Sequence, residues 1–484
     1  MVMLQKILRI FSLIILLVFW IASCAINPVT GQRELMLLDE QEEIELGRQV
    51  NIQVVQEFGI YNDPELSTYV NDFCQKLAKI SHRPNLPYDC KVMDSPVVNA
   101  FAVPGGYIYF TRGILAYLNN EAEMIGVMGH ELGHVTARHS AQQYSRAQLA
   151  QVGLGVGMIF LDYLPAIAGE VAQLGVQMLF LKFSRDNERQ SDDLGVEYAS
   201  RLGYDAEQMA NFFNSLDRMR PSSDRSPLPD WFSTHPNPAE RNETVSLKAK
   251  QWQEKLGLRS PKINRDEYLR RIEGLVFGEN PRQGFVENNI FYHPDLRFEF
   301  PVPQGWILQN TPAFIRLVSP NKDAMIIFTI SPEGPPKQAA LQFTQKNKAE
   351  VIESSPTEVN GLPAHRLISE VRSSQGVLTI KSYFIEKEGK VYMFHGFTSP
   401  VRFDQYSPTF SITMEKFREL TDPKKLAVKP PRVRIRSAPQ GGSVRGVLVA
   451  LGVPEDDLER TALLNGKTLN ENIGAGTMMK VIGK

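Results

Sequence analysis

One stretch, Asn120–Arg138, constrains the fold of this chain more than any other, because it joins a helix pattern to metal-binding side chains. His130 and His134 are four positions apart, so both imidazoles lie on the same side of a helix and can ligate one zinc ion. Glu131 can reach a water on that metal and act as the general base. The sequence therefore predicts a metal-binding helix with one zinc ion per chain. Its buried face is formed by Ile125, Met128, Leu132 and Val135, which recur at helical spacing.

Glycines interrupt this predicted helix at three positions, Gly126, Gly129 and Gly133. Each lowers the stability of a helix by about 1 kcal/mol relative to alanine. A helix that merely exposes two histidines gives no reason for them. Because a glycine has no Cβ atom, a second backbone can approach it closely. We expect another segment of the chain to pack very near the metal-binding helix.

A catalytic zinc ion has three protein ligands and one open position, so a third ligand must accompany the two histidines. Val135–His139 lacks the Gly-x-x-His that continues a metzincin motif, which places this ligand further along the chain. A helix is predicted to open at Ser184, with Glu188 and Asp192 on one of its faces. Glu188 can supply the third ligand, and Asp192 can hold a ligating histidine through its ring N–H. Taken alone, this pair would more often be a solvated helix face.

Two further histidines have no metal-binding spacing of their own. His139 follows His134 by five positions, so we expect it to point well away from His134 and to have a structural role. By its pattern alone, His235 is a rigid loop residue that caps backbone groups. The residues that stiffen its loop are Trp231, Pro236 and Pro238.

Residues 1–23 have the pattern of a lipoprotein signal peptide, with a basic start followed by an apolar run. The run Ile10–Ala22 has 13 residues, too few to span a bilayer comfortably. Ile21–Cys24 resembles a bacterial lipobox, which predicts lipidation of Cys24. An uncleaved anchor is the alternative, but it leaves Cys24 without a role. No aspartate of the kind that retains lipoproteins in the inner membrane follows Cys24, so the anchor is expected in the outer membrane.

Together and in order, these motifs resemble peptidase family forty-eight, which includes HtpX and the CAAX prenyl endoproteases. The lipobox points to the periplasmic, BepA-like branch of that family, and the resemblance covers about residues 27–250. It implies an α+β fold with a mainly helical, gluzincin-type zinc peptidase domain and a small hairpin or sheet. The motifs are Asn99-Ala100-Phe101-Ala102, the Gly105-Gly106 hairpin, His130–His134, Glu188–Asp192, Thr234-His235-Pro236 and Arg241.

The resemblance also implies a role for each of these residues. The strand that contains Asn99, Ala100, Phe101 and Ala102 would hold the substrate backbone as an added strand. His235 and Arg241 would form a loop pair near the reacting carbonyl. The zinc ligands would be His130, His134 and Glu188, with Glu131 as the base and Asp192 supporting a ligand from behind.

The resemblance also implies that His235 lies close to the metal, where it could have either of two roles in catalysis or its regulation. A neutral imidazole could occupy the open zinc position and silence the enzyme until substrate displaces it. A positively charged imidazole could instead stabilise the oxyanion that forms at the carbonyl.

The remainder of the chain predicts further domains after a peptidase domain at residues 24–265. Alternating apolar residues indicate an α+β accessory domain at 286–420, faintly similar to the photosystem-accessory PsbP type. A proline- and lysine/arginine-rich linker at 421–439 leads into residues 430–484, which weakly resemble a LysM-type module that binds peptidoglycan. No tetratricopeptide period is visible.

Two other segments leave alternatives open. Cys74 and Cys90 could form a disulfide in an oxidising compartment, stabilising the fold by about 3 kcal/mol, or could be two buried thiols. Leu149–Phe183 is apolar and glycine-rich, but charged residues and a proline interrupt it before it reaches the length of a membrane span. It predicts two buried or membrane-facing helices, or a surface that captures unfolded chains.

The predicted function is a lipid-anchored, periplasmic zinc endopeptidase, a hydrolase of protein quality control that cuts misfolded or stalled outer-membrane and other envelope polypeptides. The alternative is an envelope chaperone or assembly scaffold with a dormant or structural zinc site, which would have no need of Glu131. The expected contacts are the membrane, through the anchor, and possible contact with peptidoglycan. A formal net charge of -1 gives no reason to expect nucleic acid as a partner.

Overall fold

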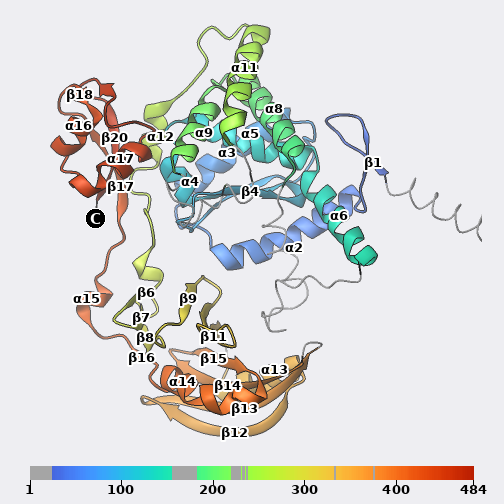
Figure 1. The fold of residues 1–484 in the computed structure, drawn as a ribbon, viewed down its shortest axis with the longest axis vertical. Helices are drawn as coiled ribbons and strands as arrows, with labels where there is room; N and C mark the ends of the chain where they lie inside the picture. Colours follow the sequence, from blue (N-terminus) through green and yellow to red (C-terminus); the bar gives the residue numbers. More distant parts are fainter. Residues whose placement is uncertain are drawn as a thin grey trace, which may run out of the picture.

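The computed structural model describes most of the chain and divides it into a helix-rich upper body and a sheet-rich lower one (Figure 1). Residues 1–23 and 155–182 lie outside the described part, so the signal peptide and most of the apolar stretch Leu149–Phe183 are not addressed by it. The described residues are 24–154, 183–219, Trp231, His235, 238–331, 334–373 and 376–483.

The upper body is built around helix α5 (Glu121–Thr136), the predicted metal-binding helix. Asn120 caps this helix by accepting a hydrogen bond from the backbone N–H of Glu123. Every residue of α5 is buried, because other elements cover it all round. The helices that contact it are α3 (Pro64–Ile80), α6 (His139–Leu154), α8 (Arg185–Arg201), α9 (Gln208–Arg218) and α12 (Arg265–Arg271). The upper body also contains α2 (Glu40–Phe58), α4 (Arg112–Tyr117) and α11 (Pro238–Leu256).

A three-stranded sheet lies beside α5 in the order β3-β5-β4. Strands β4 (Ala100–Val103) and β5 (Tyr107–Thr111) are antiparallel and joined through Pro104–Gly106, which confirms the predicted hairpin. Gly105 and Gly106 have φ angles of 79° and 101°, which residues with a Cβ atom rarely adopt. Strand β3 (Asp89–Met93) runs parallel to β5, so β4 forms one edge of the sheet.

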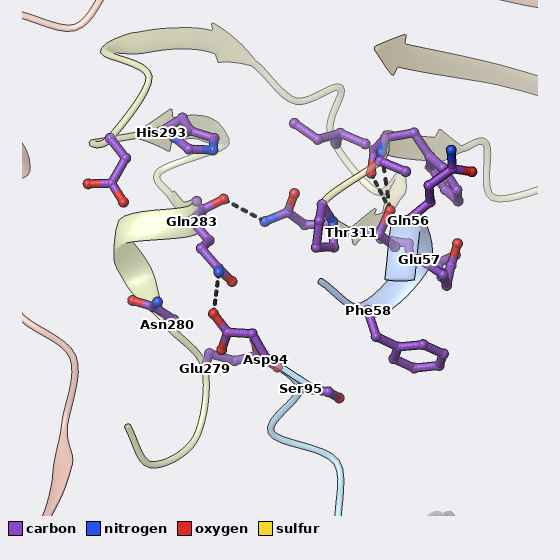
Figure 2. Close-up of a pocket in the computed structure, with 18 of the residues that line it drawn as sticks. Gln56, Glu57, Phe58, Asp94, Ser95, Glu279, Asn280, Gln283, His293 and Thr311 are labelled. Atoms are coloured by element: carbon purple, nitrogen blue, oxygen red, sulfur yellow. Dashed lines mark hydrogen bonds between the residues drawn. The ribbon is translucent and has the colours of Figure 1, made fainter. Parts of the chain in front are cut away.

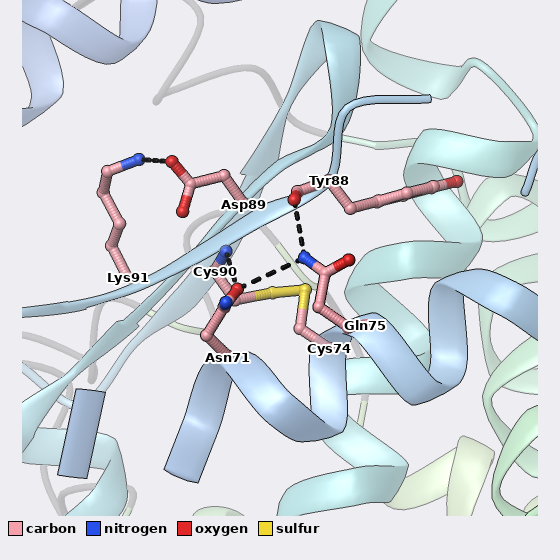
Figure 3. The surroundings of a disulfide bond; sticks show 7 residues. All are labelled: Asn71, Cys74, Gln75, Tyr88, Asp89, Cys90 and Lys91. Atoms are coloured by element: carbon pink, nitrogen blue, oxygen red, sulfur yellow. Dashed lines mark hydrogen bonds and ion pairs between the residues drawn. A yellow bond between two sulfur atoms is a disulfide. The ribbon is translucent and has the colours of Figure 1, made fainter. Parts of the chain in front are cut away.

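A disulfide joins Cys74 on α3 to Cys90 on β3 (Figure 3). Two hydrogen bonds from α3 hold the same pair of elements together: Gln75 Nε2 donates to the carbonyl of Tyr88, and Asn71 Oδ1 accepts from the backbone N–H of Cys90. The structure therefore contains the bonded form of the two that the sequence left open.

The lower body is an α+β domain, as predicted, with a seven-stranded antiparallel sheet in the order β12-β13-β14-β15-β11-β10-β9. Helices α13 (Pro336–Asn347) and α14 (Phe403–Glu415) cover its opposite faces, because neighbouring residues of one strand belong to two separate apolar cores. Ile326 and Phe328 pack with α14, whereas Ile327 packs with α13. The strands are β9 (Ile307–Asn310), β10 (Ile315–Val318), β11 (Ala324–Ser331), β12 (Glu350–Val359), β13 (Leu362–Ser373), β14 (Gly376–Lys387) and β15 (Lys390–Thr398).

A smaller four-stranded sheet, in the order β16-β8-β7-β6, completes this accessory domain. Its strands are β6 (Phe285–Glu287), β7 (Ile290–His293), β8 (Phe298–Pro301) and β16 (Arg418–Glu419). A cavity of about 760 Å³ lies where the accessory domain meets the end of α2 (Figure 2). Across this cavity, the side chain of Gln283 donates a hydrogen bond to Asp94.

The C-terminal module does not hang free after a linker but packs against the upper body (Figure 1). The second half of the predicted linker is strand β17 (Arg432–Ser437), which pairs with β20 (Met478–Gly483). Val433 of this strand belongs to the same apolar core as α5. Lys480 of β20 is fully buried, and its Nζ donates to the carbonyls of Ala116 and Leu118, at 2.7 and 2.8 Å. Strand β17, in which apolar residues alternate with arginine, lies where the predicted linker (421–439) and the predicted module (430–484) overlap.

The module also contains the short helices α16 (Val444–Ala450) and α17 (Leu458–Leu464), and its likeness to LysM modules stays a prediction. Within the described part of the chain, no helix combines the length and the apolar character that a bilayer crossing requires.

Candidate active site

Four side chains converge in the middle of the upper body: His130, His134, Glu188 and His235. One ligand atom from each lies within 4.8 Å of the others, and all four residues are buried. The Nε2 atoms of His130 and His134 are 3.1 Å apart, and Glu188 Oε1 lies 3.5 Å from His134 Nε2. The described part of the chain contains no second group of histidine, cysteine, aspartate or glutamate side chains that could hold a metal ion.

Glycines place Glu188 opposite the two histidines, as the sequence predicted. A Cβ atom on Gly129 would lie 3.0 Å from Gly195 Cα, and one on Gly133 would lie 3.1 Å from Ser191 Cα. Few Cβ atoms approach a neighbouring backbone so closely, so helices α5 and α8 lie this close because these positions have no side chain. Gly126 contacts the Met209 side chain in the same way. The close second backbone is therefore confirmed, and it is α8.

Asp192 holds His130 from behind. Its Oδ1 lies 2.9 Å from His130 Nδ1, so the ring donates this hydrogen bond and turns Nε2 toward the cluster. Arg241 then binds Asp192 through two hydrogen bonds of 2.6 Å and reaches Glu188 Oε2 at 2.7 Å. One guanidinium therefore holds two carboxylates in place: that of Asp192, which contacts His130, and that of Glu188, which belongs to the cluster.

Arg241 differs from its predicted position. The family resemblance implies a loop position beside His235, near the reacting carbonyl, whereas the structure places Arg241 in helix α11, in contact with Glu188 and Asp192. Its guanidinium lies 4.5 Å from the centre of the Phe213 ring, which covers it on one side. The physical reason is charge: two buried carboxylates need a counter-ion close to them.

His139 contradicts the prediction that it points away from His134. The Nδ1 atoms of the two residues lie 3.0 Å apart, and His139 Nε2 lies 2.8 Å from Gln190 Oε1. The prediction extended helix α5 past its end at Thr136. Arg138 instead adopts a left-handed φ of 59°, which turns the chain and brings His139 back over the helix.

The site's charges favour neutral imidazoles at the two α5 histidines and a charged carboxylate at Glu188. Burial, followed by nearby positive groups, lowers the pKa of His134 well below its usual value, and burial outweighs Asp192 in lowering the pKa of His130. Burial alone would raise the pKa of Glu188, but the charges of His235 and Arg241 lower it overall. These are the protonation states in which such groups ligate a metal ion.

Glu131 is buried beside the cluster, and neither of its carboxylate oxygens has a hydrogen-bond partner among the described residues. Burial raises its pKa to about 8, although the nearby His235 charge acts in the opposite direction. The nearest charged contact is His235 Nε2, 3.5 Å from Oε1. A buried carboxyl group without a structural partner is costly for stability, which marks it as a group kept for chemistry.

His235 closes the open side of the cluster. Its Nδ1 lies 3.0 Å from Glu188 Oε1 and 3.3 Å from His130 Nε2, so the ring nitrogen is at the distance of a fourth donor. Trp231 stacks on the ring at 4.3 Å, and the Trp231 carbonyl accepts the backbone N–H of His235. A histidine that only caps backbone groups would not need the contacts that its ring makes with Glu188 and His130. Among the aromatic neighbours, Phe183 stacks on His134 at 4.0 Å.

The predicted substrate strand borders the site without contributing to the cluster. Asn99 precedes β4, whose free edge is the one turned away from β5. The side-chain Oδ1 of Asn99 is buried and has no hydrogen-bond partner among the described residues. Ala100 and Phe101 are buried in two different apolar clusters, so they anchor the strand.

The donor set fits a metal ion. Two neutral imidazoles and a carboxylate are the ligand types of catalytic zinc sites, which leave a fourth position open. The convergence of their atoms, with Glu131 unpartnered beside them, is the observation that supports the fit.

Comparison with known proteins agrees with this geometry. Residues 64–248, which include α5 and α8, match Peptidase family M48. The matching part of the chain, residues 64–248, is called the M48 domain below. It contains every ligand-type residue of the cluster as well as Glu131, Asp192 and Arg241.

Relatives of the M48 domain include the beta-barrel assembly-enhancing protease of Escherichia coli (strain K12), 30% identical over 233 residues, which cover 46% of this chain and 47% of that protein. The mitochondrial metalloendopeptidase OMA1 of Homo sapiens is 23% identical over 248 residues, 48% of this chain and 47% of that protein. The similarity thus spans about half the length of these relatives.

Among solved structures, the solution structure of cyanobacterial PsbP (CyanoP) from Synechocystis sp. PCC 6803 is 18% identical and covers 27% of this chain and 91% of its own. The TM-score of 0.24 is too low to establish a shared fold.

Proposed function

We propose that the M48 domain is a zinc-dependent endopeptidase. The observation that carries this proposal is the buried cluster of His130, His134 and Glu188 beside Glu131, a carboxyl group without a hydrogen-bond partner among the described residues. A structural metal site would have no use for Glu131, so the alternative of a chaperone with a dormant site is not favoured.

In the proposed mechanism, His130, His134 and Glu188 hold the metal ion. Bound zinc supplies Lewis acidity, which polarises the scissile carbonyl and makes water more acidic. Glu131 takes the proton from the attacking water and passes it to the leaving amine. Burial raises the pKa of Glu131, and the charge of a bound zinc ion would lower it again, so the carboxylate could accept the water proton near neutral pH.

Asp192 and Arg241 support this chemistry without touching substrate. Asp192 keeps the His130 proton on Nδ1, so that Nε2 is free for the metal. Arg241 keeps Glu188 and Asp192 charged and oriented. We therefore assign Arg241 a positioning role in place of one at the reacting carbonyl.

For His235 we propose a gate in the neutral form of the ring, which a bound metal ion would favour. Without the metal, burial alone would lower the pKa of His235, but the charges of Glu188 and Glu131 raise it overall. Its Nδ1 lies 3.0 Å from Glu188 Oε1 and its Nε2 lies 3.5 Å from Glu131 Oε1, so the side chain covers both the fourth metal position and the base. Substrate has to displace it. His235→Ala should then raise the rate of casein cleavage, whereas loss of an oxyanion partner would lower it. If His235→Ala changes neither the cleavage rate nor the zinc content, His235 has neither role and is only a loop residue.

For substrate we propose an extended envelope polypeptide added to the edge of β4. The edge of β4 that does not pair with β5 can offer backbone hydrogen bonds, and Asn99 Oδ1, which has no hydrogen-bond partner among the described residues, can accept one more from the substrate backbone. The relatives' name, beta-barrel assembly-enhancing protease, supports misfolded or stalled outer-membrane proteins as the substrate class.

We further propose a lipid anchor at Cys24 and a periplasmic location at the outer membrane. Strand β1 (Cys24–Ile26) pairs with β2 (Arg33–Leu35), and Asn27 Nδ2 donates to the carbonyl of Ala137, just after α5. An anchor there would hold the catalytic domain close to the lipid surface. Cys24→Ser should release the protein from membranes, and an unlipidated native N-terminus in mass spectrometry would end the proposal. Contact of residues 430–484 with peptidoglycan stays a prediction.

The central test compares three glutamate-to-glutamine variants of the mature chain by zinc content and casein cleavage. Glu131→Gln should keep zinc and lose cleavage by about two orders of magnitude or more. Glu188→Gln should lose both. Glu197→Gln is the matched control, because Glu197 lies on the same helix but pairs with Arg201 at the surface. Cleavage that survives in Glu131→Gln would contradict the proposed mechanism.

A further inference from the structure

His139 stands behind His134 in the way that Asp192 stands behind His130. Its Nδ1 is 3.0 Å from His134 Nδ1, the ring nitrogen that faces away from the cluster. The two rings meet edge to face, with centroids 5.0 Å apart and planes at 72°. His139 is buried. The ring of Phe183 also stacks on the ring of His134. His134 therefore has its orientation defined from two sides.

The hydrogen bonds determine which nitrogen of His139 carries a proton. Gln190 Oε1, 2.8 Å from His139 Nε2, has only lone pairs and must accept. The proton of a neutral His139 therefore sits on Nε2, and Nδ1 is left as an acceptor. Two groups can donate to it: His134 Nδ1–H at 3.0 Å, and Ser191 Oγ–H at 3.3 Å.

We propose that His139 is a positioning residue for His134. By accepting the Nδ1–H of His134, it holds that imidazole in the tautomer whose Nε2 lone pair points at the metal position. This inference rests on the proposed metal site. It extends a relay of three groups, from Gln190 through His139 to His134, outward from the cluster.

Charge explains why a histidine suits this place. The site already contains three carboxyl groups, Glu131, Glu188 and Asp192, with one arginine among them. A fourth carboxylate behind His134 would add uncompensated negative charge to a buried region. A neutral imidazole accepts the same hydrogen bond and adds no charge.

The experiment measures Zn²⁺ affinity of the mature chain by competition with a chromophoric chelator, with a thermal melt to show that each variant is folded. His139→Phe keeps the ring but has no acceptor, and should bind Zn²⁺ about 10- to 100-fold more weakly than wild type. His139→Asn presents an oxygen acceptor near the position of Nδ1 and should stay within about threefold of wild type. His395→Phe is the matched control, since it replaces a buried histidine of the accessory domain.

The outcomes separate this inference from the metal site itself. A wild-type chain that binds no Zn²⁺ would overturn the proposed function. A wild-type chain that binds Zn²⁺ while folded His139→Phe binds it equally well would overturn the positioning role alone. If His139→Asn is as weak as His139→Phe, the acceptor is not what matters, and the inference is also wrong. A long-range nitrogen spectrum of wild type should find the His134 proton on Nδ1.

Discussion

The M48 domain and the accessory domain both bury histidines, but they do so in different ways. In the M48 domain, buried ionisable groups converge, so that ligand atoms of four residues lie within 4.8 Å of one another. In the accessory domain, the buried histidines His365 and His395 and the buried Lys381 each contact a nearby serine hydroxyl instead. His395 Nδ1 lies 2.9 Å from Ser382 Oγ, and Lys381 Nζ donates to Ser407 Oγ at 3.1 Å. Convergence, and not burial, distinguishes a reactive site from a satisfied core.

The largest effect is expected from removing Arg241, the counter-ion of the buried carboxylates in the cluster. Arg241→Met leaves the carboxylates of Glu188 and Asp192 buried without their partner, which should lower the free energy of unfolding by about 3–5 kcal/mol. Zinc binding should fall as well, because Glu188 loses its orientation. Urea denaturation with and without Zn²⁺ measures both; unaltered zinc affinity would contradict the role assigned to Arg241.

Lys480→Met tests a buried lysine that lies outside the cluster. Its amino group donates to two main-chain carbonyls, and the loss of these hydrogen bonds should lower the free energy of unfolding by about 1–3 kcal/mol. Zinc affinity measured in the same titration should equal that of wild type, since no ligand contacts this lysine. A variant that loses zinc would show that the C-terminal module reaches the metal site, and would weaken the comparison.

Gly129→Ala changes the geometry of the cluster while leaving every charge in place. The added Cβ would meet Gly195 Cα, so α8 must move by several tenths of an ångström, at a cost of about 1–2 kcal/mol in the free energy of unfolding. Because α8 positions Glu188, zinc affinity should fall by more than the small loss of stability suggests. Gly203→Ala is the comparison variant, since no atom lies near an added Cβ there, although its φ of 80° adds strain.

The smallest expected effect is on how the stability of the fold depends on pH below 7. Burial lowers the pKa of His395 to about 3, below an unfolded value near 6.5, so the folded state keeps this ring neutral. Its contribution to stability is complete above pH 6.5 and is lost as the pH falls from 6.5 towards 3, by about 1 kcal/mol at pH 5.5. His395→Phe should flatten this slope in thermal melts of the mature chain between pH 7 and 5.5. An identical slope in the variant would show that other groups set the acid sensitivity.

Local patterns in the sequence account for much of the site. The four-residue spacing of His130 and His134, the glycines of α5 and the helix opening at Ser184 each predicted a feature that the structure contains. Such features depend on contacts along one helix or on the absence of a side chain, and both can be read from neighbouring residues. The hairpin of β4 and β5 follows the same rule, because its turn residues are adjacent in the chain.

Tertiary structure alone decided where the remaining partners lie. His139 reaches His134 because the chain turns at Arg138, and Arg241 reaches Glu188 across 53 positions of sequence from a different helix. The Cys74–Cys90 bond and the docking of Lys480 onto the main body likewise join distant segments. The sequence by itself determined the helix that carries His130 and His134 and its close approach to a second backbone. The identity of the groups behind the ligands was decided by packing, since buried charges and ring nitrogens take whichever partners the folded core brings within hydrogen-bond distance.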